Sequence, residues 1–384
     1  MSNKKENASC PLKKTSIGGQ ALLEGIMMRG PKKSAMAVRC PDGEMVVEVS
    51  DLKSADRKGF LKWPVVRGVV GFVDSMTVGY RAMMRSAELS GLDEAIEEEE
   101  REKAAKKAAK EADKRAKKLG ITVEELAEQE AAEKESSPEV SEETVEAVAE
   151  ESVSESKEDK KDNSGMMTGI MVVALILGLG LAMLLFKVLP ESIYELLTWA
   201  IPSLEGEGYW FNLIRAAITG VVKIAIMVAY MAAVALMKDI KRTFMYHGAE
   251  HKTIFCYEQG LELTVENVRR QSRFHPRCGT SFLILMLLVS IVINMFIPAT
   301  LVDHKILNII ARTGIGLLTL PFIMGIGYEL IRFAGRHDNL FTRIISAPGV
   351  WLQHITTKEP DDSMIECAIA AVKEVIPEDG SDNW

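Results

Sequence analysis

Four long apolar segments constrain the fold of this 384-residue chain more strongly than any other feature. They cover residues 167–189, 213–237, 282–300 and 306–333. A helix of roughly twenty residues crosses about 30 Å of hydrocarbon, so each segment is long enough to span a membrane. Buried helices of soluble proteins rarely run so long without a polar face. The sequence therefore predicts a mainly α-helical membrane protein built on a bundle of four transmembrane helices.

The distribution of Lys and Arg around these segments predicts their orientation. The connection 190–212 contains four Glu and no Lys or Arg, whereas the connection 238–281 contains eight Lys and Arg residues. Positively charged connections stay on the cytoplasmic side. We therefore expect a multi-pass protein of the cell membrane, with the lipid bilayer as its partner. Its connection 238–281 and both termini are expected in the cytoplasm.

The charged residues are segregated from the apolar segments. Residues 92–163 consist almost entirely of Glu, Lys, Ala and Ser, which predicts a solvated low-complexity spacer. The net charge of -8 arises largely there and at the C-terminus. No basic stripe with interleaved aromatic residues is present, so we set nucleic-acid binding aside. Five cysteines at irregular spacings, and a polar N-terminus without a signal-peptide core, fit a reducing cytoplasm.

Three further cytoplasmic elements are expected. Residues 34–50 alternate between apolar and polar around a Pro-Asp-Gly turn, which predicts a β-hairpin, and the glycine-bounded segment 18–31 before it is expected to be a structured loop. Residues 60–89 are apolar but interrupted by charges, which favours an amphipathic helix on the cytoplasmic membrane face over a plain core helix. Residues 360–376 carry apolar residues at helical spacing and predict a C-terminal helix.

These elements give an expected organisation in four parts. A cytoplasmic N-terminal element at 1–91 is followed by the charged spacer at 92–163. A membrane domain at 164–340 contains the four spans, and a cytoplasmic C-terminal helix and tail occupy 341–384.

The connection 238–281 contains His247, Glu250 and His251 in the order H-x-x-E-H. On a helix the two histidines project from one face, spaced to bind a single metal ion. Glu250 would lie about 100° round the helix from His251, where its carboxylate can reach a water molecule at the metal. The pattern inverts H-E-x-x-H, in which two histidines bind zinc and the glutamate is the general base. It therefore predicts a metal site with Glu250 as the catalytic base.

Further metal ligands can come from three residues at the same membrane depth. His275 and Cys278 immediately precede the third apolar segment. Glu329 lies near the cytoplasmic end of the fourth, after a pair of glycines that would let another helix approach closely. We expect either Glu329 or the His275/Cys278 pair to complete the coordination shell of the two motif histidines.

Each of these residues also has an ordinary structural explanation. His275 could bind a backbone carbonyl, Cys278 could be a small packing residue, and Glu329 could pair with Arg332 one turn later. Lys223 lies inside the second apolar segment, where a charged side chain is costly and normally faces the interior of the bundle. A structural hydrogen bond or snorkelling explains Lys223 more simply than a transport pathway.

This chain resembles the YqhQ family of bacterial membrane proteins in the segments GGQALLEGIMMRGP, YHGAEHKTIFCYE, HPRCGTSF, GIGYELIRFAGR and PGVWLQHITTKEPDD. That family is a domain of unknown function, described only as predicted metal-dependent enzymes. The resemblance covers residues 15–89 and 165–375. It implies that the family's H-x-x-E-H and H-x-x-C motifs fall on His247, Glu250, His251, His275 and Cys278. The charged spacer is longer than the family pattern leads us to expect.

These observations lead to the hypothesis of a metal-dependent hydrolase of unknown substrate at the cytoplasmic membrane face. Its cofactor is expected to be a divalent metal, zinc by preference. In the alternative, four protein ligands close the site, and the protein is a non-catalytic membrane assembly or adaptor protein. A catalytic site leaves one position for water, so the number of ligands separates the two hypotheses. A transport function would rest on Lys223 alone.

Overall fold

The computed structural model describes residues 13–52, 59–91, 173–206, 208–298, 300–337 and 339–383. The chain divides into two compact units, one formed by Met1–Leu92 with Val188–Trp384 and the other by Asp93–Lys187. The expected spacer at 92–163 and Cys10 lie outside the described residues. In the second unit the described residues, 173–187, belong to the apolar helix Val173–Ala200.

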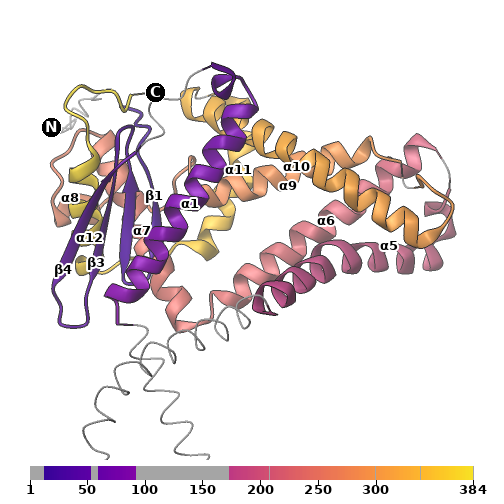
Figure 1. The fold of residues 1–384 in the computed structure, drawn as a ribbon, viewed down its shortest axis with the longest axis horizontal. Helices are drawn as coiled ribbons and strands as arrows, with labels where there is room; N and C mark the ends of the chain where they lie inside the picture. Colours follow the sequence, from indigo (N-terminus) through magenta and orange to yellow (C-terminus); the bar gives the residue numbers. More distant parts are fainter. Residues whose placement is uncertain are drawn as a thin grey trace, which may run out of the picture. The chain divides into compact units, whose positions relative to one another are not determined.

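The N-terminal residues form a four-stranded antiparallel sheet (Figure 1). Its strands follow chain order: β1 Gly18–Leu22, β2 Gly25–Arg29, β3 Lys33–Arg39 and β4 Met45–Asp51. The predicted hairpin is confirmed as β3 and β4, whose turn holds Gly43 at a φ of 88°. The segment 18–31 is not a loop but the hairpin of β1 and β2. Most residues of β2 are buried on either face, so this strand lacks the alternation by which a half-exposed strand is recognised.

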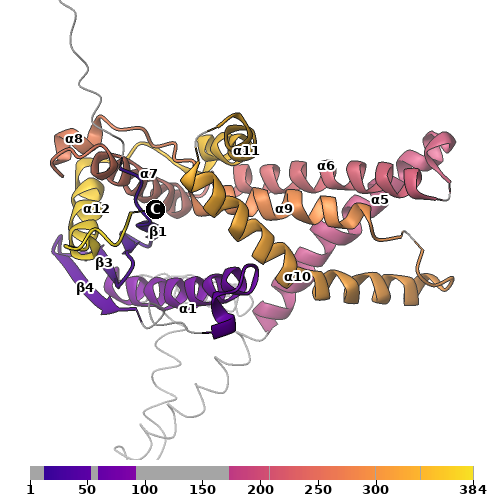
Figure 2. The same ribbon diagram turned by 90° about the horizontal axis from the view of Figure 1, so that it is seen from above.

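The sheet is covered on both faces. On one face Ile26 and Met28 belong to a core with α7 (Lys238–Glu258) and α12 (Asp362–Val375). On the other face Met27 packs against α1 (Val66–Leu89). Figure 2 shows the sheet between α1 and the pair α7 and α12. The predicted C-terminal helix is thus confirmed as α12, and the motif helix α7 is part of the sheet's core.

Helix α1 confirms the helix predicted at 60–89, after a short 3-10 helix at Gly59–Lys62. It packs along α10 (Lys305–Arg336), where a Cβ atom at Gly68 would lie 2.8 Å from the Cβ atom of Tyr328. A Cβ atom at Gly325 would likewise collide with Val65 of the preceding turn. The glycine pair of the fourth apolar segment therefore does admit close neighbours: Gly325 faces the start of α1, and Gly327 faces Phe282 and Met286 of the helix 279–295.

Among the described residues, three helices are long and apolar enough to cross a membrane: Val173–Ala200, Tyr209–Val234 (α6) and Ile306–Arg336 (α10). They match the first, second and fourth predicted spans. The remaining elements are a π-helical turn at Leu184–Val188, α5 at Leu189–Ala200, a 3-10 turn at Pro202–Leu204, α8 at Val265–Arg269 and α11 at Leu340–Thr356. Within the first unit, α6, α9 (Gly279–Met295) and α10 extend away from the end where the sheet, α7, α8 and α12 gather (Figures 1 and 2).

The third predicted span is shorter in the structure than in the sequence. Helix α9, Gly279–Met295, has 17 residues and therefore a length of about 25 Å. It ends before Pro298, whose ring disfavours helical backbone in the residue before it. A bundle of four membrane-spanning helices therefore stays a prediction. The motif helix is also separate from the second span, because α6 ends at Val234 and α7 begins at Lys238.

Candidate metal centre

The H-x-x-E-H motif lies in the middle of α7, where the helix is buried on nearly all sides. Glu250 is 5% exposed and His251 1% exposed. Gly248, inside the motif, lies against the chain that leaves α11, and a Cβ atom there would collide with the carbonyl oxygen of Lys358. The Lys358 amide donates to the Phe244 carbonyl at 2.8 Å, which holds that chain in place. The motif therefore packs against the segment that follows α11 and does not lie on an open helix face.

Backbone carbonyls orient both motif imidazoles. Nδ1 of His247 lies 2.9 Å from the Thr356 carbonyl oxygen, and Nδ1 of His251 lies 2.6 Å from that of Arg273. A carbonyl only accepts, so each Nδ1 carries a hydrogen and directs Nε2 away from the backbone. The Nε2 atom of His251 is buried and has no hydrogen-bond partner among the described residues. Metal-binding histidines are commonly held in this way, because the bond at one nitrogen presents the other to the metal.

Cys278 brings a sulfur to the same place from another part of the chain. It is the N-cap residue of α9, and its Sγ lies 3.0 Å from Nε2 of His247. One ligand atom from each of His247, His251 and Cys278 lies within 4.8 Å of the other two. Two histidines and a cysteine at such distances could hold a metal ion. Cys278 is therefore not merely a packing residue.

The charges in this three-residue group depend on one another. Burial by itself lowers the pKa of His247, but the sulfur of Cys278 raises it to about 9. Burial likewise raises the pKa of the Cys278 thiol, but its interactions with the imidazoles of His247 and His251 lower that pKa well below its usual range. The surroundings therefore favour the thiolate, which is the form of cysteine that binds metals and attacks electrophiles.

Glu250 lies beside the three-residue group, but its carboxylate oxygens are not among the ligand atoms that converge there. Its Oε1 accepts the Gly19 amide hydrogen at 3.0 Å, whereas its Oε2 is buried and has no partner in the part of the chain that the structure describes. A Cβ atom at Gly19 would lie 2.8 Å from Cδ of Glu250, so the glycine lets β1 approach the carboxylate. Burial raises the pKa of the Glu250 carboxyl against the opposing effect of the two motif histidines. A raised carboxyl pKa is the direction that a general base at neutral pH requires.

His275 is buried next to the group but directed elsewhere. Its Nε2 lies 3.6 Å from Oε2 of Glu258, and burial lowers its pKa to about 4 although Glu258 opposes the shift. The side chain of Gln353 accepts the His275 amide hydrogen and donates to the His275 carbonyl, each at 2.7 Å. These bonds fix the loop that leads into Cys278. His275 therefore supports the site from outside the three-residue group.

Glu329 is not brought to the group. It forms a two-bond ion pair with Arg67 of α1, with Nε of Arg67 2.6 Å from Oε1. The partner that the sequence suggested was Arg332, one turn away on the same helix. The pair with Arg67 depends on the docking of α1 against α10, which local spacing does not reveal. Of the expected ligands, the structure unites His247, His251 and Cys278 and leaves His275 and Glu329 apart.

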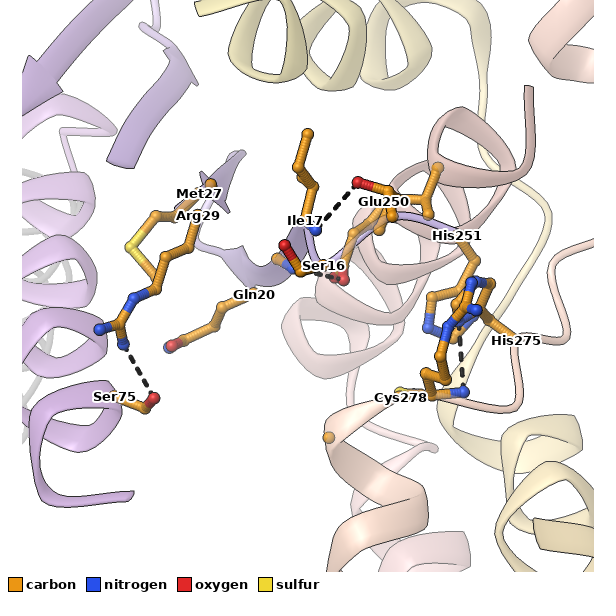
Figure 3. A pocket seen from close by; sticks show the side chains of 17 residues that line it. Ser16, Ile17, Gln20, Met27, Arg29, Ser75, Glu250, His251, His275 and Cys278 are labelled. Carbon is orange, nitrogen blue, oxygen red and sulfur yellow. Dashed lines mark hydrogen bonds between the residues drawn. The ribbon is translucent and has the colours of Figure 1, made fainter. Parts of the chain in front are cut away.

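Two cavities border the group and share Gly19, Glu250, Arg277 and Cys278 among their walls. One has a volume of about 320 Å³ and lies between β1 and α7. Figure 3 shows Glu250, His251, His275 and Cys278 among its lining side chains, with Arg29 bonded to Ser75 at the other end. The other has a volume of about 530 Å³ and lies toward α1, α9 and α10. The group is therefore reachable by small molecules from two directions.

Sequence reasoning missed the parts of the site that backbone atoms provide. These are the Gly19 amide at Glu250 and the carbonyls of Thr356 and Arg273 at the two imidazoles. Their side chains carry no chemical signal. A glycine in a strand often marks a close approach by another part of the chain, so the Gly18–Gly19 pair was the one available hint.

A comparison with curated proteins finds a relative in Bacillus subtilis (strain 168), described as the uncharacterized protein YqhQ. It is 37% identical to this chain over 166 residues, which are 43% of this chain and 50% of the relative. The chain thus matches about half the length of that relative. No solved structure matches the chain. The sequence profile of a family matches residues 63–378, from the start of α1 to beyond α12, and covers the whole three-residue group. This chain therefore belongs to the family described as protein of unknown function DUF1385.

Proposed function

We propose that this protein is a metal-dependent hydrolase whose site lies at the cytoplasmic face of the membrane. His247, His251 and Cys278 hold the metal, and Glu250 is the general base. The observation that carries the proposal is the convergence of three ligand atoms within 4.8 Å beside a buried carboxylate oxygen that has no partner. Catalytic zinc sites commonly have three protein ligands and one open position, whereas structural sites have four.

The residues fit a metal ion. Nε2 of His251 is a buried nitrogen without a hydrogen-bond partner, and such an atom is costly unless something binds it. Two imidazole nitrogens and a thiolate form a donor set that binds zinc in preference to harder cations such as magnesium and calcium. A bound metal of this kind acts as a Lewis acid that makes a water molecule more acidic at neutral pH.

The side chains of this chain then have distinct tasks. The Thr356 and Arg273 carbonyls keep the Nε2 atoms of His247 and His251 directed at the site. The Gly19 amide holds Oε1 of Glu250, which leaves Oε2 to accept a proton from water. Because burial raises the pKa of this carboxyl, Oε2 can also return the proton to a leaving group. His275 and Gln353 hold the loop that carries Cys278.

The test measures metal content and function separately. The purified wild type should contain about one equivalent of zinc, and His251→Ala should lose both the metal and the ability to complement a strain lacking the gene. Glu250→Gln should keep the metal and fail to complement, because loss of a general base costs roughly 10²–10⁴-fold in rate. His354→Ala, which changes an exposed histidine outside the group, is the control. Full complementation by Glu250→Gln with metal bound would favour the structural metal site of an adaptor protein instead.

A second function is favoured by the contact between His247 and Cys278. A cysteine at a helix N-terminus and 3.0 Å from an imidazole nitrogen also describes a nucleophile with its base. The Thr356 carbonyl would orient the imidazole, as a third group does in other such pairs. In that case the purified protein contains no metal. Iodoacetamide would then alkylate Cys278 much faster in the wild type than in His247→Ala.

We also propose that α9 crosses the membrane with its neighbours as a fourth span. It follows directly on the site residue Cys278, which is its N-cap, and it contains no Asp, Glu, Lys or Arg. An even number of spans would keep α7, the sheet and both ends of the chain on one side. The excess of Lys and Arg between α6 and α9 favours the cytoplasm for that side.

A further inference from the structure

The larger of the two cavities has a wall unlike that of the smaller one. Its volume of about 530 Å³ lies within the range of roughly 300–1,000 Å³ that is typical of small-molecule sites. Most of its lining is apolar and comes from three helices, chiefly Phe72 and Met76 of α1, Phe282 and Leu283 of α9, and Tyr328 and Ile331 of α10. We call this cavity the apolar chamber. The proposed chemistry of the metal centre leaves it without a role.

The apolar chamber has one polar end. His247, Glu250 and Cys278 lie in its wall together with Arg277. The rest of the lining is mostly apolar, with Gln20, Ser75, Thr243 and Thr280 as its other polar side chains. The ring centroids of Phe72 and Phe282 are 6.0 Å apart, so α1 and α9 meet at this wall. A ligand that fills the chamber must therefore have a polar or reactive head at one end and a hydrocarbon body at the other.

The chamber also reaches the surface of apolar helices. Leu283 of α9 is 43% exposed and Met76 of α1 is 55% exposed, although both line the chamber. α10, which provides the opposite wall, is one of the helices long and apolar enough to cross a membrane. A hydrocarbon chain in the surrounding bilayer could enter the chamber here without passing through water. Continuity with the membrane helices favours a lipid over a soluble ligand.

An extended peptide fits this place less well. Peptides that bind beside a sheet usually pair with the free edge of its outermost strand. Of the two edge strands, β1 is the one that lines the chamber, and its Gly19 amide already donates to Glu250. The side of β1 that faces the site is therefore occupied by α7.

We propose that the apolar chamber binds the hydrocarbon chain of a membrane lipid and places the lipid headgroup at His247 and Cys278, which lie in its wall. The position of the headgroup rests on the proposed hydrolase function, whereas the binding of the chain depends on the chamber alone. The substrate class of the enzyme is then a lipid with a single chain held in the site, rather than a peptide or a soluble metabolite.

The test uses the full chain reconstituted in vesicles of phosphatidylglycerol that contain a small fraction of the same lipid with a diazirine on one acyl chain. After irradiation, mass spectrometry should find the lipid on the chamber walls of α1 and α10 as well as on outward-facing residues. Leu283→Trp fills the chamber from α9 and should reduce labelling of the peptide around Phe72 by about tenfold, the change produced by 1.4 kcal/mol of lost affinity. Val292→Trp, at a 52% exposed position of the same helix, should leave that labelling unchanged.

A second variant and a peptide probe show whether the labelling comes from a lipid bound in the chamber. Ile331→Trp fills the chamber from α10, so it replaces Leu283→Trp if that variant fails to fold. Labelling of the Phe72 peptide that neither variant reduces would overturn the inference. Stronger crosslinking of the Phe72 peptide to an apolar peptide bearing photoleucine than to the lipid would also overturn the inference.

Metal analysis of the same samples distinguishes this inference from the proposed function. His251→Ala should lose the metal but keep the labelling of the chamber, because His251 is not among the residues that line it. A protein that binds zinc but never labels at Phe72 would leave the hydrolase standing without the lipid. A protein that is labelled at Phe72 but contains no zinc would support lipid binding and contradict the metal-dependent hydrolase.

Discussion

Nε2 of His247 lies 3.0 Å from Sγ of Cys278, although one residue is in the middle of α7 and the other begins α9. This contact joins the sheet-bound half of the first unit to its apolar helices. The loop between the two residues is held by Gln353, and the His247 ring by the Thr356 carbonyl, both from α11. The candidate site therefore depends on the docking of three helices, and substitutions outside the motif should affect it.

Gly19→Ala should disable the site while leaving its metal ligands intact. The new Cβ atom would lie 2.8 Å from both Cδ of Glu250 and the Met27 carbonyl oxygen, so the carboxylate must move. Overpacking of this kind costs about 1–3 kcal/mol in stability. We expect complementation to be lost while zinc content is kept. Gly18→Ala is the matched control, because a Cβ atom there meets nothing within 4 Å. Equal function of the two variants would argue against Glu250 as the base.

Glu329→Gln should leave the metal content unchanged, because Glu329 pairs with Arg67 rather than with the three-residue group. The thermal stability of the detergent-solubilised protein should fall, and Arg67→Gln should have a similar effect. In the double variant the loss should be smaller than the sum of the two, since both changes break one interaction. Loss of zinc in Glu329→Gln alone would return Glu329 to the list of ligands.

Because of the buried ion pair of Glu258 and Arg277, the free energy of unfolding should depend on pH in the acid range. Burial by itself raises the pKa of Glu258, but His275 and Arg277 lower it below its usual value. A carboxyl whose pKa is depressed by folding stabilises the protein above its unfolded pKa of about 4.3, and that stability is lost as the pH falls through the folded pKa. Melting temperatures measured from pH 7 down to pH 3 should therefore drop at the acid end. The drop should be smaller in Glu258→Gln, and unchanged in the exposed control Glu262→Gln.

The proposed topology places Glu205 outside the cell and Glu262 inside. Both residues are exposed, so cysteines introduced there should react once a reagent reaches them. A membrane-impermeant maleimide added to intact cells should label Glu205→Cys and leave Glu262→Cys unlabelled until the cells are opened, with the parent chain as the blank. Labelling of Glu262→Cys in intact cells would place the site outside the cytoplasm.

The sequence by itself determined the features that depend on neighbouring residues. Hydrophobic runs predicted the apolar helices, the spacing of His247 and His251 predicted their common helix, and the Pro-Asp-Gly turn predicted the hairpin of β3 and β4. These features follow from local periodicity, because the positions that face one side of a helix or strand are set by its own geometry. The hairpin of β1 and β2 escaped this reasoning, since burial on both faces removes the alternation.

Tertiary structure alone decided which candidate ligands meet. His275, Cys278 and Glu329 were equivalent in the sequence, as polar residues near the ends of apolar segments. In the fold, Cys278 reaches His247, whereas His275 turns to Glu258 and Glu329 turns to Arg67. The physical reason is that a buried charged or polar group must find a partner, and the nearest partner comes from whichever distant segment packs against it. That choice is made by the docking of α1, α9 and α11, which no local pattern in the chain encodes.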